Sequence, residues 1–139
     1  MTFVLDASVA LAWCFEDEDD DYAEDVLKTL RRRDAVVASH WGLEVCNGLL
    51  TAERRGRITA PEVARVVRLI MALPIAVDPV ERSRALTTTF RLSRTGKLSS
   101  YDGAYLELAV RLGLPLATLD RELRRAAEAE GVEHFEPPA

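Results

Sequence analysis

Four acidic residues stand where a folded chain could bring their carboxylates together. Asp6 and Asp120 each follow a short apolar run directly, and each precedes a stretch with a helical pattern. In a parallel sheet the carboxyl ends of the strands face a common crevice, so acids at two strand ends can meet despite their separation in the chain. Glu44 and Asp102 lie on helical stretches in between and would complete a cluster of four carboxylates. Such a cluster indicates a divalent metal and phosphate chemistry.

Converging carboxylates cannot all stay ionised without a counter-charge. Two of them about 4 Å apart repel by about 4 kcal/mol at an effective dielectric constant near 20. A divalent cation removes this conflict, and ligands that are all oxygen favour Mg²⁺ or Mn²⁺. Such metals catalyse phosphodiester cleavage by polarising phosphoryl oxygens and by deprotonating a bound water for in-line attack. The residues therefore predict Mg²⁺ (or Mn²⁺) as the cofactor.

The strand-end aspartates also have an ordinary structural explanation. Asp6 and Asp120 could be helix N-caps, because aspartate accepts hydrogen bonds from the unpaired N–H groups at a helix start. Asp78 shows how unspecific the pattern is, since it too follows an apolar run. Pro79 comes directly after it, which matches the usual pairing of N-cap and first helical residue, so we expect Asp78 to cap a helix.

The two acids on helical stretches favour the metal site. Glu44 could be a solvated helix acid and Asp102 could occupy a capping-box position, but both lie among apolar or small residues, where a charge needs a partner. Asn47 shares the helix face of Glu44 and would support the site. Two hydroxyls lie beside the strand-end acids, those of Ser8 and Thr118. They could hold a ligand or a water, or they could be ordinary residues of a first helical turn and a strand edge.

The elements that would position these acids alternate between strand and helix along the chain. Apolar runs predict strands over 3–5, 35–38, 75–77 and 115–119 and a short final strand over 132–135. Amphipathic patterns predict helices over 9–15, 22–33, 40–55, 60–73, 79–96, 100–113 and 121–130, with Ser39 as the cap of the third. This alternation predicts an α/β fold with a doubly wound, mainly parallel sheet of four to five strands.

Composition limits the classes of function. The net charge of −5 argues against a nucleic-acid binder that works by bulk positive charge, but a local basic rim can still contact phosphates. We expect a soluble, cytoplasmic protein with no membrane segment, because the longest early apolar run, 9–15, is too short to span a bilayer. Basic residues near two helix ends are candidate RNA contacts: Arg54, Arg55, Arg57, Arg91, Arg94 and Lys97. Of these, Arg94 and Lys97 are preferred.

Four motifs resemble those of the PIN-domain nucleases, and more narrowly those of the VapC-type toxins of bacterial toxin–antitoxin pairs. They are Val-Leu-Asp-Ala-Ser at 4–8, Glu44-x-x-Asn47, Tyr101-Asp102-x-x-Tyr105, and Ala-Thr-Leu-Asp at 117–120. The resemblance covers about residues 3 to 136. It implies a single PIN-like domain over 1–136 with a tail at 137–139, and a three-layer α/β/α fold.

The resemblance also implies a function. It predicts a Mg²⁺- or Mn²⁺-dependent endoribonuclease that is a homodimer and is neutralised by a small VapB-like antitoxin protein. The residues carried over as catalytic and metal-binding acids are Asp6, Glu44, Asp102 and Asp120, with Asp6 and Asp102 as direct ligands and Thr118 and Asn47 as supporting groups. The acidic segment 16–21 is not part of the family motif, and could be a solvated loop or a contact for a basic antitoxin segment.

Other functions stay open from the residues alone. A PIN-type nuclease could act on DNA or in RNA maturation, and a non-catalytic binding module would use the acids only as caps. A signalling receiver domain would need adjacent acids after the first strand, but Ala7 follows Asp6. A metal-free ribonuclease would commonly use paired histidines, and the chain has only His40 and His134, in unrelated positions.

Overall fold

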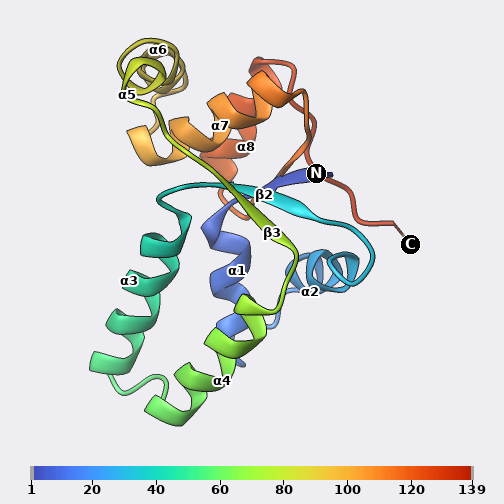
Figure 1. The fold of residues 1–139 in the computed structure, drawn as a ribbon, viewed down its shortest axis with the longest axis vertical. Helices are drawn as coiled ribbons and strands as arrows, with labels where there is room; N and C mark the ends of the chain where they lie inside the picture. Colours follow the sequence, from blue (N-terminus) through green and yellow to red (C-terminus); the bar gives the residue numbers. More distant parts are fainter. Residues whose placement is uncertain (1, 139) are drawn as a thin grey trace.

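A four-stranded parallel sheet forms the centre of the molecule (Figure 1). The computed structural model describes residues 2–138. Strand order is β3–β2–β1–β4, with bounds β1 (Phe3–Leu5), β2 (Ala35–Ala38), β3 (Ile75–Asp78) and β4 (Leu116–Ala117). The inner strands β1 and β2 are wholly buried, as expected for parallel strands covered on both faces. The predicted final strand over 132–135 is reduced to one parallel bridge between Leu116 and His134.

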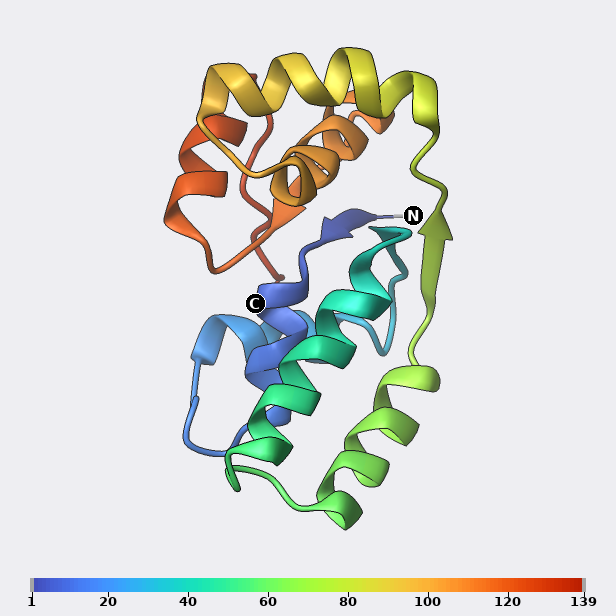
Figure 2. The same cartoon turned by 90° about the vertical axis from the view of Figure 1, so that its left-hand side faces the viewer.

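Helices cover both faces of the sheet, which confirms the three-layer α/β/α fold. One layer holds α1 (Ala7–Cys14), α2 (Asp21–Thr29), α3 (Trp41–Arg54) and α4 (Ala60–Met71). The other holds α5 (Arg82–Arg84), the π-helical turn η1 (Ala85–Thr89), α6 (Phe90–Gly96), α7 (Ser100–Leu112) and α8 (Arg121–Ala129). Figures 1 and 2 show these two groups on opposite sides of the strands, with α5, η1 and α6 as one continuous rod. None of the helices in residues 2–138 is long and apolar enough to cross a membrane.

Helix α7 packs on the sheet and carries much of the core. It contacts β1, β2 and β4, and its Tyr105, Leu106 and Leu108 are almost completely buried. Because one side of this helix is fixed on the strands, its first turn is held at the carboxyl edge of the sheet. Asp102 lies in that turn.

Asp78 does not cap a helix, so that prediction is wrong. It is the last residue of β3, where it pairs in register with Ala38, and the next helix starts only at Arg82. A residue before proline favours extended backbone, so Pro79 fits a strand end as well as a helix start. The Asp78 carboxylate instead binds the guanidinium of Arg111 on α7 at 2.6 Å.

An ion-pair group joins the edge strand to α7. Arg111 also donates to the buried carboxylate of Glu107 at 2.8 Å, and Arg84 approaches the same carboxylate at 3.5 Å and that of Asp78 at 3.8 Å. Two arginines therefore pair with three carboxylates, because Arg84 also binds Glu81 at 2.9 Å. A buried carboxylate such as that of Glu107 needs such partners.

The predicted cap of α3 by Ser39 is also wrong. The N-cap position is His40, which makes no side-chain cap bond. Ser39 Oγ instead accepts a hydrogen bond of 3.1 Å from the N–H of Val80. Since Ser39 follows β2 and Val80 follows β3, this bond joins the ends of two neighbouring strands, a contact that local spacing cannot predict.

Candidate metal centre

The four acids singled out in the sequence line one open depression of about 340 Å³ at the carboxyl edge of the sheet. Asp6 follows β1 and Asp120 follows the strand β4 beside it, while Glu44 comes from α3 and Asp102 from α7. Ser8 and Asn47 also line the depression, whereas Thr118 is buried. The remaining lining consists of small or apolar residues: Ala7, Leu11 and Gly48.

Asp6 is buried and held by two hydroxyls. Its Oδ2 accepts a 2.7 Å bond from Ser8 Oγ and a 2.6 Å bond from Thr118 Oγ1. Asp6 occupies the N-cap position of α1, yet its side chain makes no cap bond. Burial raises the pKa of its carboxyl, an effect that the two hydroxyl bonds oppose and the charge of Glu44 increases.

The two hydroxyls are themselves fixed by the backbone. Ser8 Oγ accepts a 3.0 Å bond from the N–H of Leu119, and Thr118 Oγ1 accepts a 3.0 Å bond from the N–H of Asp120. Because each hydroxyl has one proton, accepting from the backbone directs that proton to Asp6. Ser8 and Thr118 therefore position Asp6 and tie the start of the chain to the segment after β4.

Glu44 is half-buried and has two partners that the motif spacing did not assign. Tyr105 Oη donates to its Oε1 at 2.5 Å, and His40 Nε2 lies 3.3 Å from the same oxygen. Burial alone would raise the pKa of Glu44, but the bonds from His40 and Tyr105 lower it. Burial and the bond to Glu44 raise the pKa of Tyr105, so its hydroxyl stays a donor. The sequence signals for Tyr105 were its place in the motif Tyr101-Asp102-x-x-Tyr105 and its position three residues after Asp102, one turn along the same helix.

Asp102 carries the electrostatic signature of the cluster. It is half-buried in the first turn of α7, where Ser99 Oγ accepts from its N–H. Burial raises its pKa to about 6, and the negative charges of Asp6, Asp120 and Glu44 contribute in the same direction. The other three carboxylates therefore make it more costly to ionise Asp102, a cost that a divalent cation relieves. A donor set made only of oxygens fits Mg²⁺ or Mn²⁺.

Asp120 both caps a helix and lines the depression. Its Oδ1 accepts bonds of 2.8 and 3.2 Å from the N–H groups of Glu122 and Leu123, so it is the N-cap of α8. It also lines the depression with the other three acids. The capping interpretation is thus correct for Asp120, whereas the side chain of Asp6 makes no such bond.

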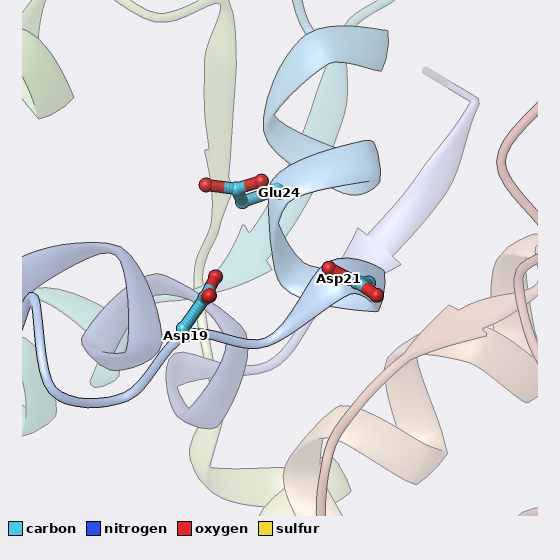
Figure 3. A group of neighbouring side chains, drawn as sticks. All are labelled: Asp19, Asp21 and Glu24. Carbon is cyan, nitrogen blue, oxygen red and sulfur yellow. The ribbon is translucent and has the colours of Figure 1, made fainter.

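A second group of acids lies on the surface at the start of α2. This group consists of Asp19, Asp21 and Glu24 (Figure 3). Within residues 2–138 it is the only group of three or more His, Cys, Asp or Glu side chains whose ligand atoms all lie within 4.8 Å of one another. All three are exposed, as is common for acids without a bound ion. The central acids are more widely spaced, so a shared Mg²⁺ would be reached in part through water, which this ion commonly retains.

The candidate RNA contacts lie outside the depression. Arg94 and Lys97 are exposed at the end of α6, and the Arg94 guanidinium lies 4.6 Å from the centre of the Phe90 ring. Arg57 binds the carboxylates of Asp17 and Glu18 at 2.9 and 3.1 Å. The acidic segment 16–21 is therefore partly neutralised by the chain itself.

The fold and the acids at its carboxyl edge define a three-layer α/β protein with a carboxylate centre. The chain matches the PIN domain over residues 3–129, so it belongs to the PIN-domain family, which confirms the resemblance drawn from the motifs. It is 28% identical over 123 residues to a protein named Ribonuclease VapC3 from Pyrobaculum aerophilum, covering 88% of this chain and 92% of that protein. The crystal structure of PAE2754, also from Pyrobaculum aerophilum, has the same fold, with a TM-score of 0.70 at 22% identity over 92% of this chain and 87% of that one.

Proposed function

We propose that this protein is a Mg²⁺- or Mn²⁺-dependent endoribonuclease and the toxin of a toxin–antitoxin pair. The observation that carries the proposal is the convergence of Asp6, Glu44, Asp102 and Asp120 on one depression in a PIN domain. The relative named as a ribonuclease covers nearly the whole chain and supports RNA as the substrate.

The chain's own residues would divide the chemistry as follows. Asp6 and Asp102 would hold the ion, and Asp102 must lose its proton to do so. The bound ion would polarise the scissile phosphate and lower the pKa of the attacking water. Glu44, whose pKa is lowered by bonds from His40 and Tyr105, would stay ionised at neutral pH and could accept a hydrogen bond from the attacking water. Ser8 and Thr118 keep the Asp6 carboxylate in place while this happens.

The proposal includes two protein partners, a second copy of the chain and a VapB-like antitoxin. Apolar side chains exposed on α3 and α4 support protein contacts, with Leu43 at 73% and Met71 at 79% exposure. Helix α4 has apolar residues along much of its length and buries none of them fully. We expect a dimer mass by light scattering for the purified protein.

The proposal is tested by incubating the purified protein with a mixed RNA pool in Mg²⁺, in Mn²⁺ and in chelator. We expect endonucleolytic cleavage with either metal, none in chelator, and none with Asp6→Asn, which keeps the shape of the side chain. Cleavage in chelator, or by the variant, would refute the mechanism. A single-stranded DNA pool run in parallel separates the two nuclease alternatives, because preferential cleavage of DNA would replace RNA as the substrate.

A further inference from the structure

A second hollow, of about 320 Å³, adjoins the metal centre and has a different chemistry. We call it the α8 pocket. It shares Asp120 with the acidic depression, so the two hollows are neighbours, and Thr118 forms part of its wall. Its lining combines aromatic, basic and acidic side chains: Tyr22, Thr118, Leu119, Asp120, Arg121, Arg124, His134 and Glu136.

One wall of the α8 pocket is a rigid aromatic pair. The rings of Tyr22 and His134 stack with centroids 4.8 Å apart and planes 23° apart. Tyr22 Oη donates a 2.7 Å bond to the carbonyl oxygen of Phe135, which fixes the ring. Burial lowers the pKa of His134, and the positive charge of Arg124 acts in the same direction, so the imidazole is neutral at pH 7. The wall is thus an uncharged stacking surface.

Two arginines from the start of α8 also line the α8 pocket. Arg121 and Arg124 are both exposed, and they stand one turn apart on the same helix face. Arg124 makes an exposed contact of 3.3 Å with Glu128, and within residues 2–138 Arg121 has no ion pair. Asp120 and Glu136 also line the pocket, but the Asp120 carboxylate is engaged by the N–H groups that it caps.

An acidic metal centre needs such a neighbour if its substrate is a nucleic acid. Without a bound ion its four carboxylates repel the phosphates of an incoming strand. Proteins bind single strands by combining cationic groups along the backbone with aromatic surfaces on which bases stack. Arginine suits phosphate because its planar guanidinium can donate two parallel hydrogen bonds. The α8 pocket offers both elements within one hollow.

We infer that the α8 pocket holds the nucleotide next to the scissile phosphate of a single-stranded RNA, with its base against the Tyr22–His134 wall and its phosphate on Arg121 and Arg124. This inference rests on the proposed function and adds a substrate subsite to it. Because the subsite borders Asp120, its occupant and the bond to be cut belong to adjacent positions of one strand. Arg121 and Arg124 are binding residues here and take no part in the chemical step.

The test compares the double variant Arg121→Gln, Arg124→Gln with the control Arg125→Gln. Arg125 is on the same helix, is exposed and pairs with Glu122 outside the pocket. Binding of a labelled single-stranded RNA is measured by fluorescence anisotropy, in chelator, between about 50 and 200 mM salt. Losing the contact to this one phosphate should reduce the slope of log affinity against log salt by about 0.7. The control should keep the wild-type slope.

Cleavage kinetics in Mg²⁺ supply the second readout. We expect the double variant to raise KM about tenfold with little change in kcat, the pattern of a group that binds substrate and transition state equally. If the wild type cleaves RNA and the double variant has the same salt slope and KM as Arg125→Gln, the subsite is refuted and the nuclease proposal still holds. A wild-type protein that neither binds nor cleaves RNA would refute both.

Discussion

Among residues 2–138, two groups of carboxylates are candidates for a metal site, and the tighter group is the less promising one. The ligand atoms of Asp19, Asp21 and Glu24 gather within 4.8 Å, yet all three side chains face water. Asp6 and Asp102 are more widely spaced from their acidic neighbours, but they are buried or half-buried and have raised pKa values. Proximity of acids therefore does not identify a metal centre. What distinguishes the central group is the energetic cost of keeping its charges ionised, which a bound cation can offset.

The surface group needs no cation because water and a helix terminus stabilise it. Two charges about 4 Å apart repel by only about 1 kcal/mol in bulk water. Asp21 and Glu24 lie in the first turn of α2, where negative charge interacts favourably with the helix dipole. The neighbouring Asp20 caps the same helix by accepting from the N–H of Ala23 at 2.9 Å. These acids have a structural role without any ligand.

The largest expected difference between the two groups is in activity. Asp102→Asn should lower RNA cleavage about a thousandfold, because loss of a metal ligand removes several kcal/mol of transition-state stabilisation. Asp21→Asn, the matched change in the surface group, should leave the rate unchanged. Initial rates in Mg²⁺ and calorimetric titration with Mn²⁺ measure both effects. A loss of activity in Asp21→Asn with Asp102→Asn unaffected would reverse the assignment of the metal centre.

An intermediate effect is expected at the support of Glu44. Tyr105→Phe removes the hydroxyl that donates to Glu44 while keeping the buried ring. Partners that orient metal-site residues are typically worth 10- to 100-fold, so we expect about a tenfold loss in metal affinity or in cleavage rate. The control is Tyr101→Phe, in which the lost hydroxyl belongs to a largely exposed ring. Equal behaviour of the two variants would show that the Tyr105 hydroxyl has no special role.

The smallest expected effect is on stability and depends on pH. The pKa of Asp102 is about 6 in the folded chain against an ordinary 3.8, so the folded state binds more protons between these values. The free energy of unfolding therefore falls as pH rises through that window, and Asp102→Asn abolishes this decrease. For this half-exposed group we expect a gain of about 1 kcal/mol after allowing for solvent screening.

This gain should appear as a rise in Tm of about 2 to 4 °C at pH 7 in chelator. It should disappear below about pH 3, where the aspartate is protonated in both states. Asp21→Asn is again the control, and Mg²⁺ should favour the wild type because only its intact site binds the ion well. Thermal melts at both pH values test this, and a variant that melts lower than the wild type at pH 7 would contradict it.

The central group was predictable from sequence because each acid stands in a setting with a strong local signal. Apolar runs located β1 and β4, whose neighbouring positions in a parallel sheet bring Asp6 and Asp120 to the same edge. Glu44 and Asp102 stood out as charges within apolar helical stretches. In all four cases local pattern and global fold agree.

Contacts between distant segments could not be predicted in this way. Asp78 and Ser39 both have the chemistry of a cap, but their partners, Arg111 and Val80, come from other elements. The role of Tyr105 in holding Glu44 likewise requires α7 to lie beside α3. Local spacing shows which interactions a side chain is able to make. Which of them forms depends on the residues that the fold places next to it.

The bond between Thr118 and Asp6 has a consequence for the timing of activity during synthesis. Chains emerge amino-terminus first, at about 5–20 residues per second, so Asp6 leaves the ribosome well before Leu116–Asp120 exists. Until that segment docks beside β1, Asp6 lacks one of its two hydroxyl donors and the depression lacks Asp120. The centre of a nascent chain is therefore incomplete, and the proposed cleavage of RNA begins only after residues 116–120 have been translated and have docked.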